Sequence, residues 1–249
     1  MWPFDRLRTS SFRRKRKPRA SLPTGLQVGA NVPVVMRARY DAAQTTAENR
    51  RHWAMADALS ADSAMSADVR KKLRENARYE VANNSYAKGI VLTLANDCVG
   101  TGPRLQLLTS DGKLNNRIEE AFADWCRAVG LAGKLRTMRG AKATDGETFA
   151  VLTANPLVDS PIMLDMQLVE ADRVAAPWVS LVDDAGDIDG ITLDAWGNPQ
   201  SYSILRQHPG DLSAWRHEFD LLDATSVIHW FREDRPGQQT GRLAEVAGH

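Results

Sequence analysis

The sequence predicts an α+β fold: a basic disordered arm, then a helical segment, then a mainly antiparallel β-sheet packed on the helices. Two observations support this prediction. Apolar residues recur at helical spacing over residues 40–145, whereas beyond residue 145 apolar and polar residues alternate, as in strands with one buried face. Helices followed by strands along the chain are typical of the α+β class. The 249 residues are therefore expected to divide into parts 1–39, 40–145, 146–237 and a C-terminal tail, 238–249.

The N-terminal arm is strongly basic, although the whole chain has a formal net charge of only +1. Residues 1–39 contain ten Lys or Arg and one Asp, which leaves 22 bases and 30 acids in the rest of the chain. A basic arm on an acidic body is typical of a flexible interaction tail. Such an arm binds nucleic acid by releasing counterions, docks on an acidic protein surface, or stays solvated without a specific partner. The candidate contact residues are Arg13, Arg14, Lys15, Arg16, Lys17 and Arg19.

The helical segment is expected to start with a short helix at residues 45–57 and a linker of small residues at 59–66. A longer helix should follow, because Ser66 is a suitable N-cap. The polar run Asn83–Ser85 predicts a kink or break in it. The face expected to be buried has one apolar residue every four positions: Val69, Leu73, Ala77 and Val81.

A second helix is expected from Tyr86 to Cys98, where apolar residues crowd together as in a helix buried on more than one side. Gly100 supplies a C-terminal stop, and Gly102-Pro103 prevents continuation into the strand-like segment that ends at Leu107. The glycines resemble a nucleotide-binding loop, but that loop follows a strand and opens a helix. We therefore interpret them as a turn.

Two further helices are predicted, at 117–129 and 131–143. The first has an apolar stripe typical of core and ends at Gly130. Its stripe consists of Ile118, Phe122, Trp125 and Val129. The second predicts a basic surface, which contacts subunits or nucleic acid or is simply solvated. Its basic positions are Lys134, Arg136, Arg139 and Lys142.

Strands are predicted wherever the alternating pattern appears after residue 145. One pair of strands is expected to form a hairpin, because Trp196-Gly197-Asn198-Pro199 between them favours a tight turn. The predicted strands cover 147–154, 163–169, 190–195, 201–207, 219–222 and 227–231.

One acidic group is a candidate metal site. Asp165, Glu170 and Asp172 lie around a predicted strand end, where paired carboxylates can bind a divalent cation and support a metal-dependent hydrolase. The adjacent Arg173 favours a salt-bridged strand end instead.

Other patterns give no catalytic residue. The acidic run 183–190 lacks the register of a calcium loop, so we interpret it as a solvated turn. His229 and Glu233 are four apart but lie in an alternating segment, so they do not share a helical face. Nucleophile-elbow and Walker sequences are missing. We expect no catalytic, cofactor-binding or metal-binding residue, and no enzyme.

The two cysteines and the hydropathy of the chain indicate the cellular compartment. Cys98 and Cys126 lie in apolar helical patterns, which favours buried thiols in a reducing compartment over a disulfide. The sequence has no apolar run long enough to span a membrane and no secretory signal. A soluble protein made in the cytoplasm is expected.

Several segments resemble, in matching order, the portal protein family of lambda-type tailed bacteriophages, the head-to-tail connectors. The resemblance covers about residues 37–237, and none of its motifs is catalytic. The segments that carry it are Arg78–Leu107, Leu135–Glu147, Leu168–Val174, Asp189–Pro199, Tyr202–Pro209 and Val227–Gly237.

The resemblance implies a structural virion protein, with residues 146–237 as the wing-like region of a portal subunit. Family members form a ring at one capsid vertex, let DNA pass during packaging and ejection, and join head to tail. The implied partners are other portal subunits, capsid and scaffold proteins, terminase, a head–tail adaptor and DNA. The implied locations are the host cytoplasm during assembly and then the virion.

This chain is shorter than the family's subunits and diverges over residues 238–249, so stem, clip and most of the channel are expected to be missing. A deliberate truncation, a frameshifted prophage gene and a genuine short form all fit this ending. The alternative function is a free-standing nucleic-acid-binding protein that uses the basic arm.

Overall fold

The computed structural model describes residues 46–47, 50–54, 56–176, 187–211 and 218–241. The chain divides into two compact units, Met1–Ala56 and Asp57–His249. In the first unit the described residues are mainly turns, and the rings of His52 and Trp53 lie 4.6 Å apart. The short helix predicted at 45–57 was therefore wrong for the described residues. The basic arm lies outside them.

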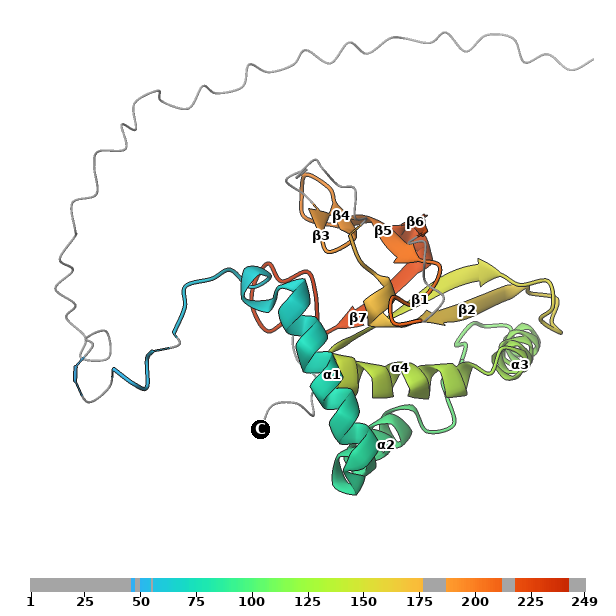
Figure 1. Ribbon diagram of the computed structural model, residues 1–249. Coiled ribbons are helices and arrows are strands. Elements are labelled where there is room, and N and C mark those ends of the chain that lie inside the picture. Colours follow the sequence, from blue (N-terminus) through green and yellow to red (C-terminus); the bar gives the residue numbers. More distant parts are fainter. Residues whose placement is uncertain (1–45, 48–49, 55, 177–186, 212–217, 242–249) are drawn as a thin grey trace, which may run out of the picture. The chain divides into compact units, whose positions relative to one another are not determined.

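The described part of the second unit has four α-helices followed by two antiparallel sheets, so the α+β prediction is confirmed (Figure 1). The helices are α1 (Ala67–Asn83), α2 (Ser85–Val99), α3 (Gly112–Ala128) and α4 (Leu131–Asp145). The first sheet has the strand order β2-β1-β7, with β1 (Glu147–Ala154), β2 (Leu164–Val169) and β7 (Val227–Phe231). The second has the order β3-β4-β5-β6, with β3 (Asp187–Ile188), β4 (Ile191–Leu193), β5 (Pro199–Leu205) and β6 (Phe219–Asp223). Three short 3-10 turns, η2 (Ser63–Met65), η3 (Ala171–Arg173) and η4 (Ala224–Ser226), complete the elements.

The break between α1 and α2 is confirmed at Asn84. Its backbone is extended, and its side-chain oxygen accepts hydrogen bonds from the amides of Tyr86 and Ala87, which caps α2. The buried face of α1 matches the predicted one only in part, since Ala77 is buried and Leu73 and Val81 are partly buried. Arg70 and Arg74 are buried beside Ala77, whereas Val69 is 42% exposed. The arginines are buried because carboxylates from other elements meet them, as described below.

Helix α2 is buried on one side only, so the prediction of burial on several sides was wrong. Its small buried residues, Ala87, Val91 and Ala95, face α4. The approach is close: a Cβ added to Gly140 of α4 would lie 3.6 Å from a methyl carbon of Val91. Tyr86, on the outer side of α2, is 85% exposed. Cys98 is also exposed, contrary to the prediction of a buried thiol.

The turn after α2 is confirmed, but the strand predicted beyond it is absent from the described residues. Gly100 ends α2 with a φ of +54°. Gly102 then passes so close to α4 that an added Cβ would lie 2.9 Å from the Cβ of Ala132. Residues 103–108 pair with no strand and run beside α3 instead, where the amide of Leu107 donates to Glu119 at 2.7 Å.

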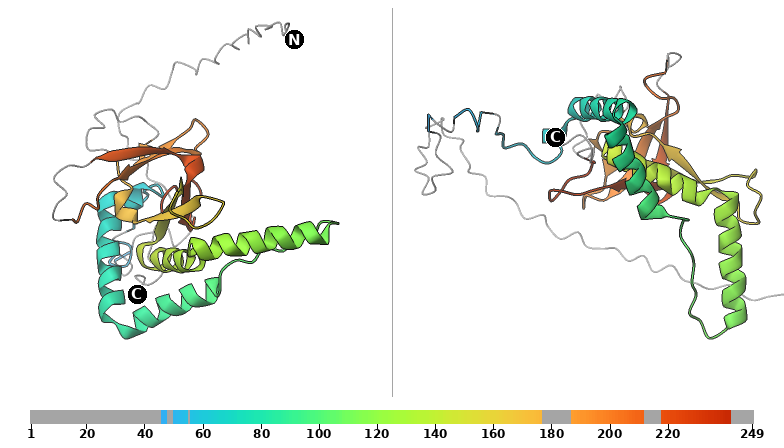
Figure 2. Two further views of the ribbon diagram at one scale, coloured as in Figure 1. Left: turned by 90° about the vertical axis from the view of Figure 1, so that its right-hand side faces the viewer. Right: turned by 90° about the horizontal axis from the view of Figure 1, so that it is seen from below.

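Helix α3 begins earlier than predicted, because Asp111 caps its first turn by accepting from two backbone amides. Its apolar stripe is core only at the C-terminal end, where Trp125 packs against a buried cluster. Ile118, nearer the N-terminus, is exposed. Figure 2 shows the reason, since α3 projects away from the sheets and from α4.

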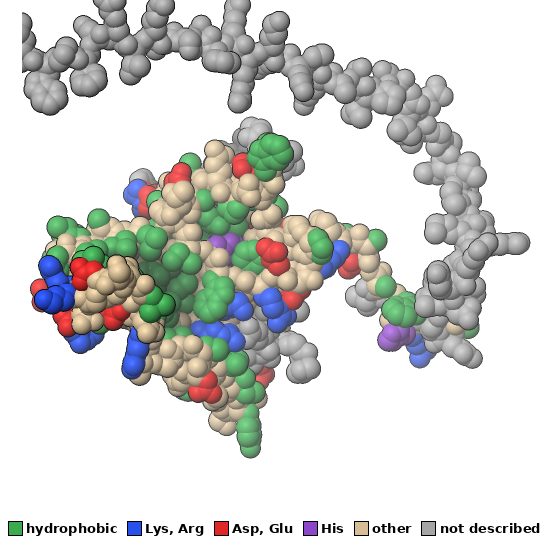
Figure 3. All heavy atoms as spheres, turned by 180° about the vertical axis from the view of Figure 1, so that it is seen from behind, with side chains coloured by type: hydrophobic (Ala, Val, Ile, Leu, Met, Phe, Trp, Pro, Cys, Tyr) green, Lys and Arg blue, Asp and Glu red, His purple; other side chains and the backbone are tan. Residues whose placement is uncertain are grey.

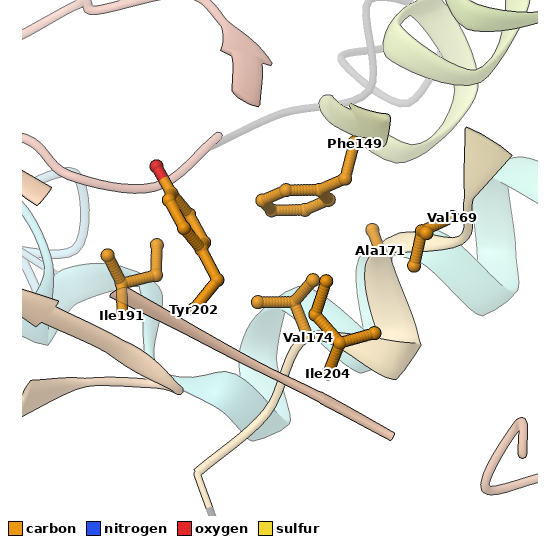
Figure 4. Close-up of a cluster of buried hydrophobic side chains, with 7 residues drawn as sticks. All are labelled: Phe149, Val169, Ala171, Val174, Ile191, Tyr202 and Ile204. Carbon is orange, nitrogen blue, oxygen red and sulfur yellow. The ribbon is translucent and has the colours of Figure 1, made fainter. Parts of the chain in front are cut away.

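Two buried clusters hold the unit together. One lies between the two sheets and includes Phe149, whose ring lies near that of Tyr202 (Figure 4). The ring of His229 stacks on that of Phe149, with centroids 4.2 Å apart. The other packs α4 against the opposite face of β1 and β2, through Met138, Ala150 and Met166 among others. Alternate residues of β1 therefore pack in different buried clusters.

The predicted hairpin is confirmed, with β4 and β5 antiparallel around Trp196–Asn198. A second tight turn joins β3 to β4 at Asp189-Gly190, both of which have positive φ. Only glycine fits the latter position, because an added Cβ would lie 2.6 Å from the backbone carbonyl of Ala175.

Candidate functional site

The predicted contact residues of the arm, Arg13, Arg14, Lys15, Arg16, Lys17 and Arg19, lie outside the described residues. The structure therefore does not place them. The site that it does build lies in the second unit, where charged side chains of α1 meet carboxylates from four other parts of the chain.

The three candidate metal ligands, Asp165, Glu170 and Asp172, do not form one site. Asp165 pairs with Lys134 and accepts from the side chain of Asn155 at 2.9 Å. The hydrogen bonds from Lys134 and Asn155 lower the pKa of Asp165 to about 2. Among the described residues, no group of three or more potential ligands is arranged to hold a metal ion.

The other two carboxylates belong to the α1 site. Asp172 accepts from Arg74 at 3.0 Å and from Arg78 at 2.6 Å. Glu170 lies 3.0 Å from Nε2 of His208, and Asp172 lies 3.6 Å from the same atom. The interpretation as ion pairs at a strand end agrees with this geometry.

Helix α1 presents three arginines at successive turns, Arg70, Arg74 and Arg78. Arg70 pairs with Asp189 in the β3–β4 turn and donates to Thr240. Arg78 pairs with Asp145 at the end of α4, at 2.8 Å. Residues far apart in sequence are thereby fixed against one helix. We call this group the α1 charge network.

Glu147, at the start of β1, is the central acceptor of the α1 charge network. Its side chain is only 4% exposed and accepts from Arg74, from His229 at 3.0 Å and from the amide of Gly241 at 2.8 Å. Burial alone would raise the pKa of Glu147, but the hydrogen bond from His229 and the charge of Arg74 hold it below its usual value. Removing one partner is expected to cost far more than for a surface pair.

Residues 238–241 lie inside this network. Gln238 is buried and accepts from the amides of Asp234 and Arg235, while its amide group donates to the carbonyls of Arg232 and Thr240. Gly241 is close to the start of β1, since an added Cβ would lie 2.5 Å from the carbonyl oxygen of Gly146. The segment connects the end of the sheet region to the start of α1.

A cleft of about 420 Å³ lies beside the network, between α1 and residues 208–210. His208 accepts the amide hydrogen of Gly210 at Nδ1, and its Nε2 lies 3.0 Å from a carboxylate oxygen of Glu170. In the cleft wall, Asp172 pairs with both Arg74 and Arg78. The arrangement supplies charge pairs that hold these elements together.

The basic surface predicted on α4 was wrong, because its bases serve contacts within the unit. Lys134 pairs with Asp165, and Arg136 donates to the carbonyl of Gly100 at 2.7 Å. Arg139 is buried. Lys142 is also buried and lies 5.5 Å above the ring of Trp230.

Large apolar side chains are exposed on several elements of the second unit. They include Tyr86 on α2, Ile118 on α3, and Trp196, which is 90% exposed at the tip of the β4–β5 hairpin. On the face drawn in Figure 3, hydrophobic side chains gather in a shaded hollow near its centre. Exposed apolar surface of this kind is typical of proteins that bind other proteins.

Sequence reasoning missed the α1 charge network. A signal was present, since three arginines stand four apart along one helix. Their acceptors cannot be identified from that pattern, because Glu147 and Asp172 follow Arg74 by 73 and 98 residues.

The comparisons agree with the family resemblance. The family model described as "Phage portal protein, lambda family" matches residues 47–243. The search of curated proteins finds no match. In the part of the chain that the structure describes, no helix is both long enough and apolar enough to cross a membrane.

Proposed function

Since the chain belongs to the lambda family of phage portal proteins, we propose that it acts as a portal subunit. In this role it joins other subunits in a ring at one capsid vertex, through which DNA passes during packaging and ejection. The family is structural rather than enzymatic, and its members are virion components. The observation that carries the proposal is the match itself, which spans the whole described part of the second unit.

The character of the second unit supports a role in assembly. Its interior is fixed by the α1 charge network, whereas apolar side chains on α2, α3 and the β4–β5 hairpin are exposed. A rigid unit with unpartnered apolar surface suits a subunit that packs between neighbours. Asp165 and Asp172, two of the candidate metal ligands, form ion pairs instead, which also suits a structural role.

The basic arm has a separate proposed task. We infer that Arg13, Arg14, Lys15, Arg16, Lys17 and Arg19 contact DNA or an acidic virion protein during assembly. The charge segregation of the sequence supports this, because nine net positive charges precede an acidic body. Such contacts would weaken steeply with salt.

Fractionation of purified phage particles tests the proposed function. The chain, detected by quantitative mass spectrometry, should sediment with DNA-filled heads in far fewer copies than the shell protein. Its absence from particles, together with recovery on free DNA in the host lysate, would overturn the proposal. That result would favour the free-standing nucleic-acid-binding protein.

A further inference from the structure

Residues 238–241 follow β7 and pass beside the start of α1, and we call them the strap (Figure 1). Gln238, Thr240 and Gly241 are buried, and Gln239 is partly buried. Neither apolar cluster includes a strap residue, so hydrogen bonds hold the strap in place. A segment that is fixed in this way can open without breaking an apolar core.

Gln238 shapes the strap from within. Its side-chain oxygen accepts from the amides of Asp234 and Arg235, at 3.0 Å and 3.3 Å. Its amide group donates to the carbonyls of Arg232 and Thr240, at 3.0 Å and 2.6 Å. Both amide hydrogens and both acceptor positions of the oxygen are therefore used. Since the side chain is only 2% exposed, its removal leaves four backbone groups without this partner inside the unit.

Gln239 joins the strap to two segments that are distant in sequence. Its backbone amide donates to the carboxylate of Asp62, which precedes α1, at 3.2 Å. Its side-chain amide donates to the carbonyl of Gly197, in the turn between β4 and β5, at 3.1 Å. One residue therefore links the approach to α1 with the second sheet.

Thr240 and Gly241 join the strap to the α1 charge network. The hydroxyl of Thr240 accepts from Arg70 at 2.6 Å, and Arg70 also pairs with Asp189 in the β3–β4 turn. The amide of Gly241 donates to Glu147 at 2.8 Å. A buried polar group that loses its partner is costly. These hydrogen bonds are therefore expected to break together.

The start of α1 depends on the strap, because its own local support is weak. Residues 66–69 are exposed, and the side chain of Ser66 makes no cap hydrogen bond. The buried residue that follows is Arg70, whose side chain is held by Thr240 and Asp189. Helix α2, in contrast, is capped by its own Asn84.

We propose that the strap and residues 57–70 form one local unit, which opens and closes as a whole while the other helices and sheets stay folded. On opening, Arg70 loses Thr240 and Glu147 loses the amide of Gly241, so the start of α1 is freed from the β3–β4 turn. Helix α4 and the first sheet stay closed, because their apolar cluster contains no residue of either segment. The opening belongs to the fold and does not depend on the portal role.

Hydrogen exchange of the full chain, resolved for single amides by nuclear magnetic resonance, tests the opening. The reporter amides form hydrogen bonds in the two segments, and they are those of Gln239, Gly241, Met65 and Arg70. In the unchanged chain the four should share one protection factor, lower than that of Lys134 in α4, because they exchange through the same opening.

Gln238→Ala should make all four reporter amides exchange faster by one common factor of about 30, because it removes the internal support of the strap. The amide of Lys134 should keep its rate. Glu233→Ala is the matched control, since Glu233 is exposed on the segment between β7 and the strap. It should leave every rate unchanged.

Asp62→Ala tests the coupling from the opposite side. It removes the acceptor of the Gln239 amide and leaves Glu147, the acceptor of the Gly241 amide, in place. Gly241 should nevertheless exchange about tenfold faster, by the same factor as Gln239. This variant keeps Gln238, so it tests the opening even if Gln238→Ala does not fold.

Three results would overturn the inference. Faster exchange confined to Asp234 and Arg235 in Gln238→Ala would show that the strap does not open as a whole. An unchanged rate for Gly241 in Asp62→Ala would show that the two segments open separately. Acceleration of Lys134 by the same factor as the reporter amides would show unfolding of the whole unit instead of a local opening.

Discussion

Replacing Arg74 by Met should destabilise the second unit strongly, because Arg74 is the most fully engaged base of the α1 charge network. Its guanidinium donates to Glu147, to Asp172 at 3.0 Å and to the carbonyl of Asp145 at 3.3 Å. Methionine keeps the length and the helix propensity of the side chain, so the change isolates the charge and its hydrogen bonds.

The magnitude follows from what the substitution leaves behind. Breaking a buried ion pair from one side costs about 3–5 kcal/mol, because a charge remains buried without its partner. Glu147 would keep His229 and the amide of Gly241, and Asp172 would keep Arg78. Because these partners remain, the expected loss in the free energy of unfolding is at the lower end of that range, about 3 kcal/mol.

Urea unfolding followed by far-ultraviolet circular dichroism measures this loss as a lower midpoint with an unchanged slope. The matched control is Lys72→Met on the same helix, because Lys72 pairs with Glu75 in solvent. That pair should contribute at most about 1 kcal/mol. If the two variants unfolded at the same urea concentration, the reasoning about the α1 charge network would be wrong.

Three further outcomes are expected. In thermal melts, Gly190→Ala should lower the free energy of unfolding by at least about 2 kcal/mol, since the added Cβ meets backbone at a positive φ. Gly197→Ala is the control, because Gly197 has a positive φ but open space around it, and it should cost only about 1 kcal/mol. Asp165 has a folded pKa of about 2, below its ordinary 3.8, so its stabilising contribution is complete above that ordinary value and is lost as the pH falls towards 2. Asp165→Asn should therefore be less stable than the unchanged chain at pH 6 but not at pH 2, and equal differences at both values would contradict the assignment. Deletion of residues 1–20 should abolish DNA binding measured by fluorescence anisotropy. In the full chain, a plot of the logarithm of affinity against the logarithm of salt concentration should have a slope of about −5 for six phosphate contacts. A slope near zero would show that the arm does not bind DNA through its charges.

The fold could be predicted from sequence wherever local chemistry determined it. The alternation after residue 145 and the turn chemistry at Trp196–Pro199 predicted the β4–β5 hairpin, and the polar run Asn83–Ser85 predicted the break between α1 and α2. These features depend on neighbours in the chain, so a single sequence contains the information that they need.

The buried face of α1 could not be predicted in the same way. Periodicity assigns apolar residues to the core and arginines to solvent, but Arg70 and Arg74 are buried because their acceptors come from distant elements. The partners of a buried charge follow from tertiary structure, which the pattern of one helix does not contain.

The apolar stripe of α3 shows the opposite case. Its spacing correctly predicted an amphipathic helix, but Ile118 is 41% exposed in the described part of the unit. Amphipathic spacing identifies an apolar helix face, but it does not say whether residues of the same chain cover that face. The exposed apolar surface beside Trp125 can therefore be identified only once α3 is placed against the sheet.

The portal role predicts one location in the particle. Gold-labelled antibody fragments raised against residues 57–241 should bind at a single vertex of purified heads, where the tail joins, as seen by electron microscopy. Label distributed over the whole shell, or found only on free DNA and never at a vertex, would contradict the role.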